Sequence, residues 1–219
     1  MRPKRLDLDP ANANLTGFLS NSTGAGPWTM TTTTSGDGLA HQVSIRNDSA
    51  TDYSGQTFTL VGTDADGKAI SDVVTGPGNG ATVESVKFFL TLTTSTASGA
   101  GIGADTIDYG WVDEFSTKTI PLDFYLSSPP VIQVDVTGTI NFDIEVTLQN
   151  PYPNLTHEND APFDVDEQAD LSWINDANFT AKTATLVDDL ATEGVKAIRL
   201  VVNSYTDTAE LQVHISQPY

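Results

Sequence analysis

The chain has 219 residues, with 29 acidic and 10 basic side chains, three histidines and no cysteine, and its formal net charge is −19. The absence of cysteine excludes disulfides, thiolate metal sites and thiol nucleophiles. The acidic balance argues against nucleic acids and anionic membranes as partners, because both would repel the chain. No run reaches the ~18 apolar residues of a membrane helix. The first ten residues lack the apolar stretch of a secretory signal, so we expect none.

The composition favours an all-β protein. Hydrophobic residues make up 38% of the chain and charged residues 18%, and much of the remainder is Thr, Ser, Asn and Gly. Threonine suits strands because its branched Cβ fits a pleated surface, and the 17 glycines and 11 prolines suit turns. The acidity keeps exposed strand edges apart and the protein soluble. Its alternatives are a high-salt habitat, a basic partner or Ca²⁺ binding.

Residues 1–27 are predicted to form an extended N-terminal arm. Three of the ten basic residues lie in the first five positions, and the segment is rich in Gly, Pro and Asn with few apolar side chains. Such a segment buries too little surface to fold alone. It is either a frayed terminus or an arm that orders on a neighbouring subunit. For the second case, the expected interface residues are Arg2, Lys4, Arg5, Leu6, Leu8, Leu15 and Phe18.

The strand pattern begins at Trp28, where residues 28–33 alternate with a period of two. A turn is predicted at residues 35–38, and Leu39 to Ile45 form the returning strand. The polar segment 47–55 is predicted to be a loop.

The clearest hairpin follows. Residues 58–62 and 68–75 are expected to pair around the turn Asp64-Ala65-Asp66-Gly67, because Asp-Gly between alternating segments is a strong hairpin signal. Residues 83–93 are predicted to form one long strand with Val86, Phe88, Leu90 and Leu92 on its core face. A further strand is expected at residues 107–112.

The second half is predicted to begin after a linker at residues 113–121. Strands are expected at 131–136 and 140–148 around a Thr-Gly-Thr turn, and the closing pair is 196–203 with 209–216. Residues 149–170 are expected to be irregular. The one candidate for a short helix is 186–195. The expected organisation is an arm at 1–27 and two β-sandwich units at 28–112 and 120–219.

Two acidic segments are candidate calcium sites. Asp64-Ala65-Asp66-Gly67 resembles the front of a Ca²⁺ loop, but the flanking alternation favours a hairpin turn. The stretch from His157 to Asp170 offers several oxygen donors, yet no ligand spacing stands out, and a solvated loop is the preferred interpretation. We therefore assign no metal site and no cofactor.

No catalytic residue is assigned either. His41, His157 and His214 are scattered over the chain and no nucleophile elbow or zinc-binding helix motif accompanies them. The larger aromatic residues either anchor cores and interfaces, which we favour, or form a sugar-stacking platform. That set comprises Trp28, Trp111, Trp173, Tyr53, Tyr109, Tyr125 and Tyr152.

One segment carries a resemblance. FTLVGTDADGKAISDVVTGPGNGATVESVKFFLTLTT, residues 58–94, resembles a segment that recurs in small structural proteins of tailed bacteriophages. IGADTIDYGWVDE at 102–114 is similar to the strand that usually follows. The second half is similar through VDVTGTINFDIEVTLQNPY, the Trp173 segment and AIRLVVNSYTDTAELQVHISQ. The resemblance covers most of the chain beyond the arm, and it brings no catalytic residue with it.

The resemblance implies a non-enzymatic virion structural protein, assembled in the bacterial host cytoplasm. It would act as an oligomer at the head–tail junction or tail (ring, collar or adaptor-associated), with itself and other virion proteins as partners. One alternative is a capsid decoration protein, and another is a carbohydrate-binding module for host attachment. A hydrolase on a β scaffold ranks last. No nucleic acid or membrane is expected as a partner.

Overall fold

The computed structural model describes residues 4–24, 26–99, 101–122, 129–149, 151 and 171–216. These residues are almost entirely β-structure in several antiparallel sheets, which confirms the expected all-β, sandwich-like fold. By its internal contacts the chain divides into a first unit, Ala11–Phe115, and a second unit, Met1–Pro10 with Ser116–Tyr219. The division expected from the sequence has a linker at residues 113–121 and keeps 1–27 apart as an arm.

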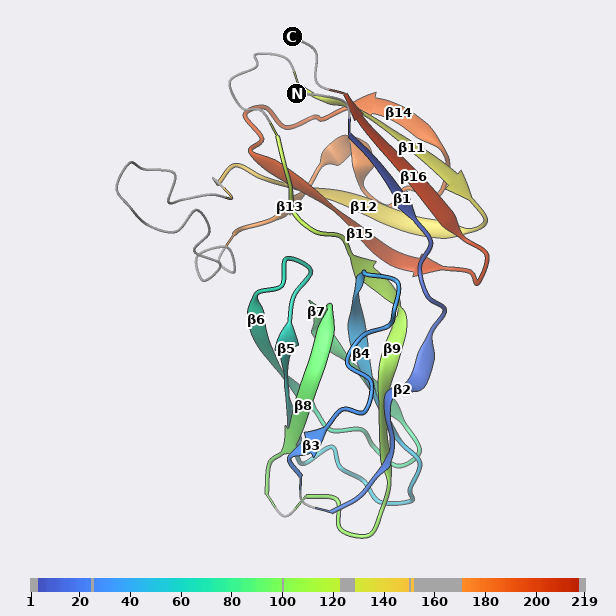
Figure 1. The fold of residues 1–219 in the computed structure, drawn as a ribbon, viewed down its shortest axis with the longest axis vertical. Coiled ribbons are helices and arrows are strands. Elements are labelled where there is room, and N and C mark those ends of the chain that lie inside the picture. Colours follow the sequence, from blue (N-terminus) through green and yellow to red (C-terminus); the bar gives the residue numbers. More distant parts are fainter. Residues whose placement is uncertain are drawn as a thin grey trace, which may run out of the picture. The chain divides into compact units, whose positions relative to one another are not determined.

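One sheet of the first unit has the strand order β3-β8-β5-β6 (Figure 1). The strands are β3 (Trp28–Thr29), β8 (Thr91–Ala97), β5 (Thr57–Thr63) and β6 (Ala69–Thr75). The predicted hairpin is confirmed, since β5 pairs with β6 from Thr57↔Thr75 to Thr63↔Ala69. Its turn places Gly67 at a φ of 83°, a left-handed conformation that glycine adopts without steric cost.

The other sheet of the first unit has the order β9-β4-β7, with β2 paired to β9. Its strands are β9 (Ile107–Ser116), β4 (Ala40–Asn47), β7 (Thr82–Phe89) and β2 (Asn14–Ser22). The two sheets enclose one apolar cluster, in which Trp28 stacks on Phe58 with ring centroids 6.1 Å apart.

The single long strand expected at residues 83–93 is wrong. The chain leaves one sheet after β7 and enters the other as β8. The register between β4 and β7 shifts between Gln42 and Ser44, and the Val43 N–H donates instead to the Ser85 hydroxyl, at 2.8 Å. Because of this irregularity Val86 points to solvent instead of into the core, and it is 81% exposed. A period of two cannot reveal a break of this kind, because the apolar spacing continues through it.

The second unit is also built from two sheets (Figure 1). The first has the order β1-β16-β11-β14, with β1 (Lys4–Leu8), β16 (Glu210–Ser216), β11 (Val131–Thr137) and β14 (Leu186–Asp189). The second has the order β13-β12-β15, with β13 (Ile174–Asn175), β12 (Ile140–Thr147) and β15 (Ala197–Tyr205), and β10 (Ile120–Pro121) pairs with β15. Buried side chains such as Val134, Phe142 and Val213 fill the space between the sheets.

Three local predictions for the second half need correction. The turns after β11 and after β15 carry the chain from one sheet to the other, so neither adjacent pair is a hairpin. The candidate helix at 186–195 is wrong, because residues 186–189 pair with β11 as β14; a 3₁₀ turn, η2 (Ala177–Phe179), lies earlier. The expected linker 113–121 contains the end of β9 and all of β10. No helix among the described residues is long and apolar enough to cross a membrane.

Candidate interaction surface

The first part of the expected arm is a strand of the second unit. Lys4, Arg5, Leu6 and Leu8 lie on β1, which pairs with β16 from Lys4↔Ile215 to Leu8↔Leu211. Leu6 and Leu8 point inward and line a small apolar hollow with residues that include Ile144 and Val213. Arg5 faces outward and bonds Asp7, with a shortest N–O distance of 2.8 Å. Arg2 lies outside the described residues.

The second part of the expected arm belongs to the first unit. Leu15 and Phe18 lie on β2, which packs directly on β9. At Gly110 the approach is so close that a Cβ would overlap the backbone of Asn14 and Leu15. Phe18 is 1% exposed and meets Trp111 edge to face, with centroids 5.1 Å apart. The expectation that Phe18 offers a surface to a neighbouring subunit is therefore wrong, because its own core encloses it.

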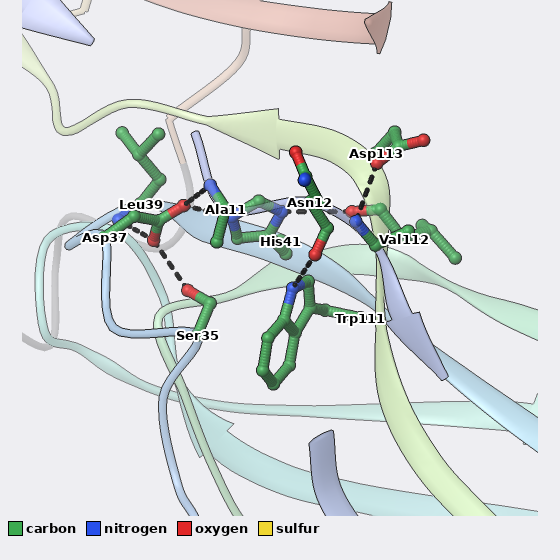
Figure 2. Close-up of polar contacts among 10 residues, drawn as sticks. Ala11, Asn12, Ser35, Asp37, Leu39, His41, Trp111, Val112 and Asp113 are labelled. Atoms are coloured by element: carbon green, nitrogen blue, oxygen red, sulfur yellow. Dashed lines mark hydrogen bonds and ion pairs between the residues drawn. The ribbon is translucent and has the colours of Figure 1, made fainter. Parts of the chain in front are cut away.

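A buried polar network ties the start of the first unit to its sheet, as Figure 2 shows. The Asp37 carboxylate accepts hydrogen bonds from the Ala11 N–H at 2.8 Å and the Leu39 N–H at 3.0 Å. The Ser35 hydroxyl also donates to it, at 2.6 Å, and His41 Nε2 lies 2.8 Å from it. Burial alone raises the pKa of Asp37, but these hydrogen bonds, with His41 first, outweigh burial and hold the pKa well below its usual 3.8.

This network holds Ser, Asp and His, but its order does not suit nucleophilic catalysis. The serine hydroxyl bonds the aspartate and not the histidine, so no base is placed to take its proton. His41 Nδ1 faces the Val112 carbonyl oxygen at 3.0 Å, and Nε2 faces the carboxylate. Both ring nitrogens therefore have an oxygen partner within the chain, and neither faces the Ser35 hydroxyl. A ring held at both nitrogens in this way links β4 to its neighbours.

Two other carboxylates also hold loops in place, one fully buried and one partly buried. Asp176 is 0% exposed and accepts from the N–H groups of Asn178, Ala191 and Thr192 at 3.0–3.2 Å. Asp64 accepts from the Asp66 and Lys68 N–H groups, each at 2.9 Å, which closes the β5–β6 turn. Among the described residues, no three His, Asp or Glu side chains gather as metal ligands would. The acidic stretch from His157 to Asp170 lies outside those residues.

The aromatic residues that suggested a sugar platform are mainly core residues. Trp28, Trp111, Tyr53 and Tyr109 are all less than 9% exposed, so their faces are not available for stacking on a ligand. Trp173 is half-buried, and the Arg199 guanidinium lies over its ring, 4.7 Å from the centroid. Tyr125 and Tyr152 lie outside the described residues.

The sheet β3-β8-β5-β6 exposes an outward surface without charge, which we call the neutral face. Phe58 and Leu60 point inward and are 0% exposed, so the alternate residues of β5 point outward. The register places outward residues of β6 and β8 beside them, for example Val73 opposite Thr59 and Thr94 opposite Val61. The neutral face consists of Thr29, Thr57, Thr59, Val61, Thr63, Ala69, Ser71, Val73, Thr75, Thr94 and Thr96.

Asp72 is the one ionisable residue of these four described strands, and it lies at the β6 edge. Its carboxylate accepts from the N–H groups of Val73, Val86 and Lys87 at 2.8–3.1 Å. The Lys87 ammonium in turn donates to the Ser71 carbonyl at 2.8 Å. These contacts engage the Val73 N–H and the Ser71 carbonyl oxygen of this edge from within the chain. A partner would therefore contact the outward side chains of this sheet, in preference to adding a strand at the edge of β6.

The corresponding outer face of the second unit, on β1-β16-β11-β14, is charged. We call it the charged face; it consists of Arg5, Asp7, Val131, Gln133, Asp135, Val187, Asp189, Glu210, Gln212 and His214. Its charged side chains reach solvent, and Arg5 and Asp7 pair with each other at 2.8 Å. His214 Nε2 lies 3.9 Å from an Asp135 carboxylate oxygen, and both side chains are 39% exposed.

The neutral face was not predicted from the sequence, although its signal is present there. The alternate residues Thr57, Thr59, Val61 and Thr63 are uncharged, and so are Ala69, Ser71, Val73 and Thr75. These outward positions of the hairpin supply eight of the eleven residues of the neutral face.

Comparisons with known proteins give little. No family model matches the chain, and no curated protein matches its sequence. Among solved structures, the crystal structure of the major capsid protein P2 from Bacteriophage PM2 aligns over 97% of this chain and 96% of that one. The identity is 10% and the TM-score is 0.20. At that TM-score the alignment supports no argument about fold or function.

Proposed function

We propose that this chain is a non-enzymatic structural protein of a tailed-bacteriophage virion, where it works by surface contact as an oligomer at the head–tail junction or tail. The observation that carries the proposal is the neutral face. In a chain of net charge −19, four strands present to solvent a surface of Thr, Ser, Ala and Val only. Folding does not require outward positions to be uncharged, so this surface is suited to contact another protein.

The buried polar groups support the same role. Asp37 and Asp176 are each held by backbone N–H groups of neighbouring segments, and they connect loops to strands. Carboxylates used in this way stabilise the scaffold. Their oxygen atoms already accept hydrogen bonds from the backbone, so they are not available to take a proton from a substrate or to bind a metal ion. The resemblance of residues 58–94 to phage structural proteins points to the same class, and this segment supplies β5, β6, β7 and the start of β8.

The test is the protein content of purified particles of the phage that encodes this chain. Quantitative mass spectrometry should detect the chain at a fixed ratio to the major coat protein. A copy number that corresponds to one ring per particle favours the junction or tail, whereas a copy number close to that of the coat protein favours capsid decoration. Particles that lack the chain, from cells that contain it in soluble form, would rule out the virion role.

A further inference from the structure

We infer that the neutral face is a self-association surface whose occupant is the same face of a second copy of this chain. The inference rests on the proposed virion role, and it names the partner that the role requires. Two observations lead to it, the distribution of charge over the outer sheet faces and the chemistry of the side chains on the neutral face.

The charge argument decides where two copies can meet. Each copy carries −19, so most pairings of surfaces bring like charges together. Screening limits such repulsion to ~8–10 Å at physiological ionic strength, which means that the charges at the contact itself matter most. If two copies met through the charged face, Asp135, Asp189 and Glu210 of each copy would lie within this screening length of the other copy. The neutral face brings no charge of its own to the contact.

The side-chain chemistry favours an identical partner over a different one. A contact between two copies about a twofold axis places the same residues on both sides, so the surface must be complementary to itself. A hydroxyl group both donates and accepts, whereas a carboxylate only accepts and an ammonium only donates. The Thr63 and Thr91 hydroxyls, 2.7 Å apart, already form this kind of bond within one chain. Threonine and valine also have few rotamers to lose when they are buried.

The size of the face predicts a weak contact. Strands of seven residues rising ~3.3 Å per residue, at a spacing of ~4.8 Å, give an outward area of roughly 400 Å² per copy. Two copies would bury roughly 800 Å², below the ~1,200–2,000 Å² of stable complexes. The isolated chain should therefore associate reversibly at high concentration. In a closed assembly, additional contacts would strengthen the same interaction.

The experiment is sedimentation equilibrium of the purified chain over a wide concentration range, with two variants that carry the same substitution. Val73→Asp adds a charge to the neutral face at a position that is 62% exposed. Val187→Asp adds the same charge to the charged face at a position that is 60% exposed. We expect the native chain and Val187→Asp to associate alike, and Val73→Asp to associate at least ~10-fold more weakly. Added salt should strengthen association of the native chain, because it screens the remaining repulsion.

A chain that remains monomeric at every concentration overturns the inference, and so does an equal loss of association in both variants. Circular dichroism verifies that each variant is folded, and Thr96→Asp replaces Val73→Asp if the latter does not fold. Failure here is distinct from failure of the virion role. A monomeric chain that is nevertheless present in particles rules out the self-contact alone, and an associating chain that is absent from particles rules out the virion role alone.

Discussion

The neutral face of the first unit and the charged face of the second unit belong to sheets of the same kind. Each sheet has four antiparallel strands, and each buries its inner side against a second sheet. The inner sides use the same types of residue, as Phe58 and Leu60 do in one unit and Val134 and Val213 do in the other. The outer sides differ, since one carries no ionisable group and the other carries several.

Folding alone accounts for the inner sides only. Alternation of apolar and polar residues is satisfied equally well by threonine, glutamate or glutamine at an outward position. A solubility requirement would favour charge on both faces, since a charged surface suppresses association between strands. The lack of charge on one face is therefore the feature that needs a functional reason, and the proposed contact with another protein would supply one.

The largest expected effect is a difference in stability between substitutions on the inward and outward sides of β5. Phe58→Ala removes a ring that is 0% exposed and stacks on Trp28, so it should cost ~3–5 kcal/mol of stability. Thr59→Ala, one residue further along on the neutral face, should cost less than ~1 kcal/mol. Urea unfolding followed by tryptophan fluorescence measures both. Similar losses for the two variants would mean that the outward side of β5 is also packed.

The next effect compares a buried carboxylate with an exposed one. Asp37→Ala leaves the Ala11 and Leu39 N–H groups and the His41 ring without their acceptor, and should cost ~2–3 kcal/mol. Asp135→Ala on the charged face should cost less than ~1 kcal/mol, because its contact with His214 is exposed. The same urea titration tests this. An equal cost at both positions would contradict the assignment of the Asp37 network as a structural clamp.

The Asp37 network also predicts a dependence on pH. The pKa of Asp37 is lowered in the folded state from 3.8, by its hydrogen bonds to His41 and three other groups that together outweigh burial. A lowered carboxyl pKa stabilises the fold above the unfolded-state pKa, and this stabilisation is lost as the pH falls through the folded-state value. The stability advantage of the native chain over Asp37→Asn should therefore be constant above about pH 5 and shrink below about pH 4. An advantage that grows on acidification would reverse the assigned sign.

Much of the fold could be predicted from the sequence, for reasons that also explain the misses. The β5–β6 hairpin was predictable because Asp-Gly and an alternating pattern act locally. The change of sheet between β7 and β8 was not, because which strand pairs with which depends on contacts far apart in the sequence. Strand β1 could not be distinguished from an arm for the same reason, since its partner β16 lies about 200 residues away along the chain. The neutral face required knowledge of which residues point outward on neighbouring strands.

A smaller effect on stability is expected in the turn that joins β5 to the edge strand β6. Gly67 has a φ of 83° and no atom within 4 Å of a built Cβ, so Gly67→Ala should cost only the ~1–2 kcal/mol of a left-handed alanine. Gly55 is equally open but has no left-handed φ, and Gly55→Ala should be neutral or slightly stabilising. Thermal unfolding compares the two variants. An unchanged melting temperature for Gly67→Ala would show that the turn adopts another conformation.

The smallest expected effect bears most directly on why the neutral face lacks charge. Val73→Thr and Val187→Thr keep a β-branched side chain at positions that are 62% and 60% exposed, so each should change stability by less than ~0.5 kcal/mol. Equal, small changes in urea unfolding would mean that neither outer face is specified by the folding of its own unit. A loss above ~1 kcal/mol for Val73→Thr alone would mean that the neutral face contributes to stability within the chain. In that case packing within the chain would explain the uncharged residues of the neutral face, and no partner would be needed to account for them.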